Sequence, residues 1–162
     1  MEFIPIASQS EMFLQLVLAM VLGLLLGAER SIAGKNAGMR TYALVALGSC
    51  AFVIISTVVG AANHLIFNSF DPLRVTAGVV TGVGFLGAGL IIFQEGAHSK
   101  LKGLTTAAGL WVAAAIGVAT GFKMYPMAIF VTLLTLLVFT LMWYIEERLK
   151  HLPNPRSNDT DS

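Results

Sequence analysis

Five long apolar stretches constrain the fold of this chain more than any other feature of its sequence. They run from Met12 to Ala28, Tyr42 to Ala61, Leu73 to Phe93, Gly103 to Thr120 and Tyr125 to Ile145. A helix needs roughly 20 mostly apolar residues to cross the hydrocarbon core of a bilayer. The sequence therefore predicts an all-α, polytopic bundle of five transmembrane helices. Residues 1–145 would form one membrane domain, and residues 146–162 a short polar cytoplasmic tail.

Composition argues against several other classes of protein. Hydrophobic residues make up 56% of the chain and charged residues only 12%, whereas a soluble domain carries about 25% charged residues. A net charge of +1 provides no basic field for nucleic acid, so we expect no such partner. The lone Cys50 allows no internal disulfide and no multi-cysteine metal site. The sequence offers no nucleophile–base pair, so we expect no enzyme, no catalytic residue, no cofactor and no bound metal.

The distribution of lysine and arginine predicts the orientation of the bundle. Eight of the ten basic residues fall in the first connection, the third connection or the C-terminal end. Because cytoplasmic segments carry an excess of these residues, we expect the N-terminus outside and the C-terminus in the cytoplasm. Aromatic residues near the predicted interfaces, where amphipathic rings belong, are Tyr42, Tyr125, Trp143 and Tyr144.

Residues 82–87, GVGFLG, fit the G-x-G-x-x-G pattern of a dinucleotide-binding turn. That pattern needs a preceding strand, whose backbone groups would stay unpaired at this depth in lipid, so we reject a nucleotide site. Each helical residue turns the chain by about 100°, which places the glycines of this stretch on two smooth faces. The alternative is that they mark an unwound helix at an ion site.

Small residues let helix backbones approach closely within a membrane. The fourth stretch carries a similar stripe of small residues, and Gly23 and Gly27 form a GxxxG pattern in the first. We therefore expect a tight bundle that a leucine at Gly82 would force apart. The glycines predicted to pack at helix interfaces are Gly78, Gly82, Gly84, Gly87, Gly89, Gly103, Gly117 and Gly121.

The densest polar stretch, residues 29–43, reads ERSIAGKNAGMRTYA. Its GK dipeptide does not complete a Walker A motif, because Glu29 stands where the first glycine belongs. We interpret the stretch as a cytoplasmic turn with Gly34 and Gly38 in special backbone conformations. Thr41 is the predicted N-cap of the second helix.

Two interpretations of this turn stay open. Free N–H groups at the start of the second helix, with Lys35 and Arg40, would hold an anion such as a lipid phosphate or an acidic residue of a partner. Alternatively, these cations are ordinary positive-inside charge. Glu29 and Arg30 are adjacent, so on a helix we do not expect them to face each other, and each needs another partner.

The remaining polar candidates lie at other helix starts. Asp71, followed by proline, predicts the N-cap of the third helix, with Arg74 one turn inside. No Asp, Glu or His falls at a midplane position, where transporters usually hold their ion sites. The candidate functional polar cluster is Glu29, Arg30, Lys35, Arg40, Thr41, Asp71, Arg74, Thr105 and Thr106.

Three segments resemble the MgtC/SapB family of bacterial membrane proteins: GLLLGAERSIAGKNAGMRTYALVALGS, DPLRVTAGVVTGVGFLGAGLIIF and KGLTTAAGLWVAAAIG. The resemblance runs from about residue 12 to residue 140. It implies the same five spans, and it marks Trp111 in addition to the polar residues and glycines named above. It also implies a multi-pass protein of the bacterial inner membrane.

Members of that family are linked to growth at low magnesium, to survival inside host cells and to restraint of the F-type ATP synthase. The resemblance thus implies such a membrane complex as a partner, beside the lipid bilayer. Many members carry a cytoplasmic C-terminal domain of the ACT type, whereas only a short tail is expected here. Functions of that domain are therefore not carried over.

Together, these features favour a regulatory or partner-binding membrane protein linked to magnesium limitation or stress adaptation. The alternative is a transporter or channel for magnesium or another small solute. Assembly into a homo-oligomer is compatible with either interpretation.

Overall fold

The structure is a computed structural model that describes residues 6–62, 71–92 and 103–150. In these ranges it has five helices and no strand: α1 (Ile6–Ile32), α2 (Met39–Ala62), α3 (Pro72–Ile92), α4 (Leu104–Gly121) and α5 (Tyr125–Lys150). All five are long and apolar enough to cross a membrane. The predicted all-α architecture with five spans is therefore confirmed.

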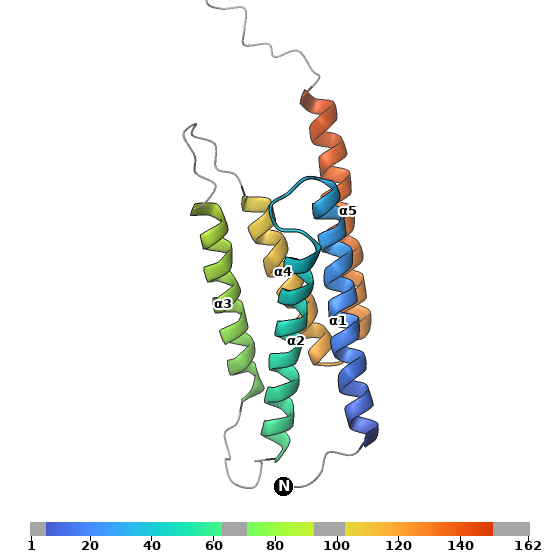
Figure 1. Cartoon of the computed structure of the whole chain (residues 1–162), viewed down its shortest axis with the longest axis vertical. Helices are drawn as coiled ribbons and strands as arrows, with labels where there is room; N and C mark the ends of the chain where they lie inside the picture. Colours follow the sequence, from blue (N-terminus) through green and yellow to red (C-terminus); the bar gives the residue numbers. More distant parts are fainter. Residues whose placement is uncertain (1–5, 63–70, 93–102, 151–162) are drawn as a thin grey trace, which may run out of the picture.

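The helices run alternately up and down one long axis, so consecutive helices are antiparallel (Figure 1). We call the end that holds residues 33–38 and the start of α4 the basic end, after Lys35 and Arg40. The turn between α4 and α5 lies toward the opposite end. Within the described chain, α4 contacts all four other helices, whereas α3 contacts only α2 and α4. The core of the bundle is therefore built around α4, and α3 lies at its edge.

Glycines bring α1, α2 and α4 into close contact. A Cβ added at Gly117 of α4 would lie within 3.0 Å of the Ala46 backbone in α2. One added at Gly23 of α1 would meet the α2 backbone equally closely, and one at Gly121 would meet the Val53 side chain. No side chain fits in these spaces, so close backbone contact holds the three helices together. The predicted interface roles of Gly117 and Gly121 agree with this packing.

The glycines of α3 do not pack in this way, apart from one. Within the part of the chain that the structure describes, a Cβ would meet nothing within 4 Å at four positions, which are Gly78, Gly82, Gly84 and Gly89. Only Gly87 reaches a neighbour, at 3.4 Å from the Cβ of Ala107 in α4. Small residues permit close approach but do not enforce it, because apolar surface gains little by leaving lipid. For these four residues, the prediction of close packing within the chain is therefore wrong.

Several helix boundaries refine the prediction. The α3 helix is continuous from Pro72 to Ile92, which contradicts the alternative of an unwound segment at its glycines. Gly103 precedes α4 in a left-handed conformation, with φ of 96°, so its role is a turn into the helix. The α5 helix continues to Lys150, five residues beyond the predicted end of the membrane domain at Ile145. Residues 151–162 of the predicted tail lie outside the described residues.

A buried glutamine ties α1 to the end of α4. Only 2% of Gln15 is exposed, and its Nε2 donates hydrogen bonds to the carbonyls of Thr120 and Gly121, at 3.1 and 2.8 Å. The last carbonyls of a helix have no partner within that helix. The Thr120 carbonyl also accepts from the Lys123 N–H at 2.9 Å, so the Gly121 carbonyl is the acceptor that depends on Gln15 inside the bundle.

We expect Gln15→Leu to lower the free energy of unfolding by about 1–3 kcal/mol, because it removes both hydrogen bonds and leaves the Gly121 carbonyl without this donor. Thermal unfolding in a mild detergent measures the change. Thr81→Val is the matched control, because it removes a hydrogen bond of 2.9 Å to Ala77 within the exposed face of α3. Equal unfolding temperatures for the two variants would contradict the role assigned to Gln15.

Candidate functional site

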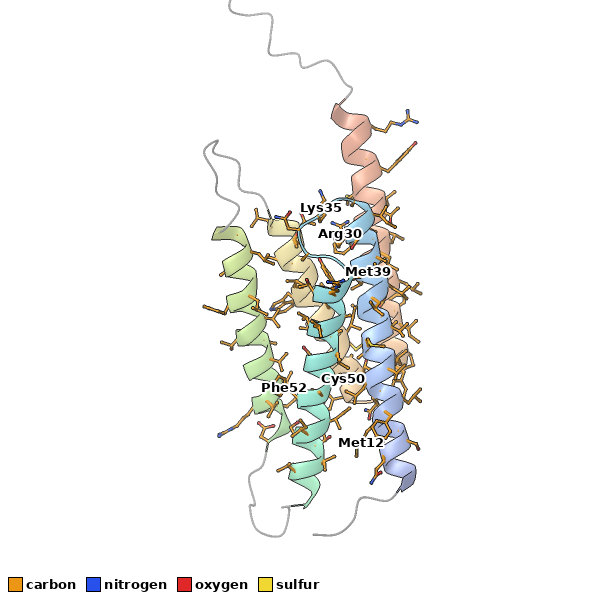
Figure 2. The ribbon with its side chains drawn as sticks, viewed as in Figure 1. Met12, Arg30, Lys35, Met39, Cys50 and Phe52 are labelled. Carbon is orange, nitrogen blue, oxygen red and sulfur yellow. The ribbon has the colours of Figure 1, made fainter. Side chains whose placement is uncertain are left out.

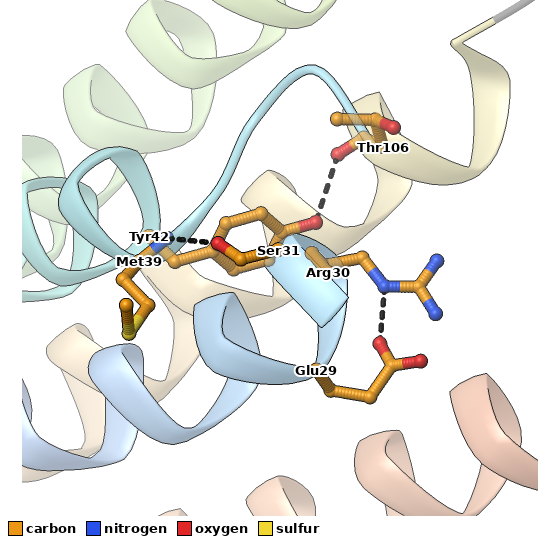
Figure 3. Close-up of polar contacts among 6 residues, drawn as sticks. All are labelled: Glu29, Arg30, Ser31, Met39, Tyr42 and Thr106. Carbon is orange, nitrogen blue, oxygen red and sulfur yellow. Dashed lines mark hydrogen bonds and ion pairs between the residues drawn. The ribbon is translucent and has the colours of Figure 1, made fainter. Parts of the chain in front are cut away.

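A buried guanidinium near the end of α1 forms the centre of a polar cluster at the basic end. Only 3% of Arg30 is exposed. Its Nε donates a hydrogen bond to a carboxylate oxygen of Glu29 (Figure 3). The guanidinium also stacks on Phe139 of α5, 3.7 Å from the ring centroid. Ion pairing and cation–π stacking together offset the cost of removing this charge from water.

The expectation that Glu29 and Arg30 would need separate partners is therefore wrong. The rule against adjacent pairs describes the directions of side chains along a regular helix surface. These two residues lie in the last turn of α1, where their long side chains bring the Arg30 Nε and a Glu29 carboxylate oxygen together. Phe139 packs over the guanidinium from α5, so the cluster joins α1 to α5.

The turn after α1 has a fixed backbone. Gly34 has a φ of +66°, a left-handed conformation that glycine adopts readily, as predicted. The Lys35 N–H donates to the Arg30 carbonyl at 2.9 Å, and Ala37 is buried. The Lys35 and Arg40 side chains stay exposed, and Figure 2 shows Lys35 close to Arg30 at the end of the bundle. The turn and the start of α2 thus present one exposed cation each, Lys35 and Arg40, on an ordered backbone.

The start of α2 is capped differently from the prediction. The helix begins at Met39, so Thr41 lies inside it, exposed, and is not the N-cap. The Met39 N–H donates to the Ser31 hydroxyl at 3.2 Å (Figure 3). Of the described glycines, only Gly34 and Gly103 have a positive φ, so the prediction for Gly38 is wrong. A Cβ at Gly38 would meet the Ser31 hydroxyl, so it would displace the group that accepts from the Met39 N–H.

Tyr42 joins the cluster to α4. It is fully buried, and its hydroxyl donates to the Thr106 carbonyl at 3.3 Å (Figure 3). The phenol lies against Gly109, where an added Cβ would collide with its hydroxyl. Tyr42 thus lies near the start of α2, where the sequence predicts an interface, but its ring is buried against α4. Thr105, in contrast to Thr106, is exposed and takes no part in this contact.

Two predicted members of the cluster, Asp71 and Arg74, lie at the start of α3, toward the opposite end of the bundle (Figure 1). An Asp71 carboxylate oxygen accepts a hydrogen bond of 2.9 Å from the Leu73 N–H, which confirms the predicted N-cap. Both side chains are exposed, and no ion pair joins them in the described part of the chain. Asp71 thus has a local structural role, apart from the basic end.

A second ion pair lies on the surface toward the opposite end. The ammonium of Lys123, in the turn between α4 and α5, donates to the Glu11 carboxylate of α1. That hydrogen bond raises the pKa of Lys123 above its ordinary value. Both side chains are about half exposed, and exposed pairs of this kind contribute little to stability. The buried pair at the basic end is therefore the stronger candidate for a functional feature.

The chemistry available at the basic end is that of hydrogen-bond donors. A guanidinium or an ammonium donates hydrogen bonds and has no lone pair for a metal ion. Among residues 6–62, 71–92 and 103–150, no group of three His, Cys, Asp or Glu residues could hold a metal ion. The arrangement suits recognition of an anionic group at the exposed turn.

Cavities flank α3 on both sides. One, of about 740 Å³, lies between α2 and α3 and begins at Arg40 and Thr41. Another, of about 270 Å³, lies among α3, α4 and the start of α5, beside Trp111. The larger cavity is lined by Gly78 and Gly82 of α3, which have no side chain to fill the gap beside them.

Sequence reasoning missed several residues that build the site. Phe139 sits among mostly apolar neighbours in α5, so no local pattern separates it from a lipid-facing residue. Gly109 and Ser31 act through partners on other helices. One usable signal was present: a buried arginine in an apolar stretch needs an aromatic or acidic partner, and Arg30 is the only arginine in α1.

The sequence of the chain matches known proteins over most of its length. The MgtC family model matches residues 16–148. The chain is 42% identical over 142 residues to the putative magnesium transporter YhiD of Escherichia coli. This alignment covers 86% of this chain and 64% of that protein. It is 39% identical over 140 residues to protein MgtC of Salmonella typhimurium, covering 86% of this chain and 56% of that protein.

A further relative is protein SrpB of Synechococcus elongatus, 37% identical over 144 residues, covering 85% of this chain and 78% of that protein. No solved structure matches the chain. The chain spans less than two thirds of the length of YhiD and of MgtC. The family match and these identities, over five helices able to span a membrane, show that the chain is a multi-pass membrane protein and belongs to the MgtC family.

Proposed function

We propose that this protein is a regulator of the bacterial inner membrane that acts by binding another membrane protein under magnesium limitation or stress. The observation that carries the proposal is the ordered basic turn. Contacts of Arg30 inside the bundle hold the backbone of this turn, while the Lys35 side chain stays exposed. A preorganised surface loses little conformational freedom on binding, so an acidic segment of a partner would dock there at low entropic cost.

The link to magnesium and to the inner membrane rests on the family. One relative carries the name MgtC, and another is named a putative magnesium transporter. The resemblance further implies the F-type ATP synthase as a partner. The basic end would face the cytoplasm, because cytoplasmic segments are rich in Lys and Arg. A homo-oligomer is compatible with this function, since a Cβ added at Gly84 or Gly89 of α3 would meet no atom of the described residues within 4 Å.

The name of the YhiD relative favours a second candidate function, transport of magnesium. A flux measurement distinguishes the regulator from the transporter. It uses liposomes that contain only the purified protein and enclose a magnesium-sensitive dye. The regulator is expected to give no magnesium flux above that of protein-free liposomes. Saturable, selective flux would overturn the proposal in favour of a transporter.

A second measurement tests the basic turn itself. Purification in a mild detergent is expected to retain one membrane complex at a fixed stoichiometry. Lys35→Glu reverses an exposed charge at the basic end and should reduce that retention at least about tenfold. Arg74→Glu, an exposed reversal toward the opposite end, is the control and should leave it unchanged. Equal retention by both variants, or no retained complex with the native protein, would contradict the proposal.

A further inference from the structure

A long apolar groove runs between α2 and α3. It has a volume of about 740 Å³, within the roughly 300–1,000 Å³ of known small-molecule sites. Its lining includes Gly48 and Phe52 of α2 and Gly78 and Gly82 of α3. A Cβ added at any of these three glycines would meet nothing within 4 Å. The groove is therefore open where the glycines lie, and no side chain of the described chain fills it.

The length of the groove corresponds to one leaflet of a bilayer. Its α2 wall extends from Arg40 to Phe52, which is about 18 Å at roughly 1.5 Å per residue. Half of a hydrocarbon core of about 30 Å is about 15 Å. A single acyl chain that enters the leaflet from the basic end would thus lie along the whole groove.

The width of the groove favours an acyl chain over a helix. The Cα atoms of α2 and α3 come within 8 Å of each other. A helix with its side chains is about 10–12 Å across, so it cannot enter between them and would only rest on the rim. An acyl chain has no backbone to pair and no branching side chains, so it fits a narrow apolar slot.

Charge is confined to one end of the groove. Arg40 and Thr41 line the mouth at the basic end, and every other lining residue except Ser49 is apolar or glycine. No carboxylate of the described residues forms an ion pair with Arg40. A guanidinium binds a phosphate through paired hydrogen bonds, and a threonine hydroxyl adds another donor. The mouth thus complements the headgroup of an anionic lipid, and the remainder of the groove complements its tail.

We propose that the groove between α2 and α3 binds one acyl chain of an anionic phospholipid, whose phosphate is held by Arg40 and Thr41. The site is independent of the proposed docking of a partner at Lys35. It would couple the position of α3 to the lipid composition of the membrane, because the bound chain supplies contacts that α3 lacks within the protein.

The test compares two lipids with the same 16-carbon chains, anionic phosphatidylglycerol and zwitterionic phosphatidylcholine. Each is titrated into delipidated protein in a mild detergent, and native mass spectrometry measures the bound fraction. We expect one phosphatidylglycerol to bind about tenfold more tightly than phosphatidylcholine. Arg40→Gln should remove this preference, and the control Arg74→Gln should keep it. Inorganic phosphate should not displace the lipid, because it lacks the chain.

Gly82→Leu tests the groove separately from its mouth. The leucine side chain would occupy the slot, so both lipids should bind at least about tenfold more weakly. The fold should persist, because no atom lies within 4 Å of the added Cβ. Equal affinity for the two lipids, unchanged binding to Gly82→Leu, or displacement by phosphate would overturn the proposal. A lipid-independent dimer that Gly82→Leu dissociates would also overturn it, and would assign the face to a second copy of the chain.

Discussion

Replacing Gly117 by leucine is expected to abolish the folded bundle. Even the first added carbon would lie within 3.0 Å of the Ala46 backbone and of the Ser49 Cβ. A flexible neighbour could rotate away, whereas a helix backbone cannot. Overpacking of an ordinary core costs about 1–3 kcal/mol and sometimes more. Here α2 and α4 would have to separate, so we expect several kcal/mol, a large share of the roughly 5–15 kcal/mol that stabilises a protein.

The measurement is the fraction of protein that elutes as a single species in a mild detergent, together with its thermal unfolding temperature. Gly82→Leu is the matched control, since it makes the same change in a glycine of α3 with no neighbour within 4 Å. We expect at least a tenfold lower yield for Gly117→Leu and a yield near that of the native protein for Gly82→Leu. Comparable yields for the two would refute the assignment of the close contact to α2 and α4.

Replacing Arg30 by leucine is expected to destabilise the protein by about 3–5 kcal/mol. Removing one partner of a buried ion pair leaves the other charge without compensation, here the carboxylate of Glu29, whose side chain is 20% exposed. The change also removes the stacking on Phe139. Arg30→Lys should be milder than Arg30→Leu, because an ammonium still compensates Glu29, yet still destabilising, because it has no planar face to lie on the ring.

Chemical unfolding in a mild detergent gives the free energies for this comparison. Lys35→Met is the control, since it removes an exposed cation five residues away and should change the stability by no more than about 0.5 kcal/mol. The double variant Glu29→Gln, Arg30→Leu should be milder than Arg30→Leu alone, because no charge is then left unpaired. If the double variant is no milder, the ion pair is not the source of the loss.

The length and composition of the apolar stretches predict the helices well. Tyr125 begins both the predicted and the observed fifth helix, and the starts of the third and fourth each differ by one residue. This works because a span is defined by its own residues. The glycines of α3 cannot be interpreted from their own sequence, since a smooth helix face is compatible with a neighbouring helix, a lipid or no contact at all. Only the positions of α2 and α4 decide among these.

In the candidate site, too, features set by local sequence were predictable and contacts between distant helices were not. The N-cap at Asp71 and the left-handed Gly34 follow from local backbone chemistry, and both predictions are confirmed. The partners of Arg30 and Tyr42 come from α5 and α4, 109 and 64 residues further along the chain. No local pattern encodes such distances, so the sequence revealed the residue types at the basic end without their contacts.

The central place of α4 has a consequence for how the protein is made. Translation releases α1 and α2 first, and they can pair through Gly23 and Gly27 as soon as both have entered the bilayer. The helix that contacts all the others comes fourth. Until it arrives, Tyr42 has no Gly109 to lie against, and α3 has only α2 beside it. Insertion of α4 is therefore the step at which three helices, of which α3 contacts only α2, become a closed membrane domain.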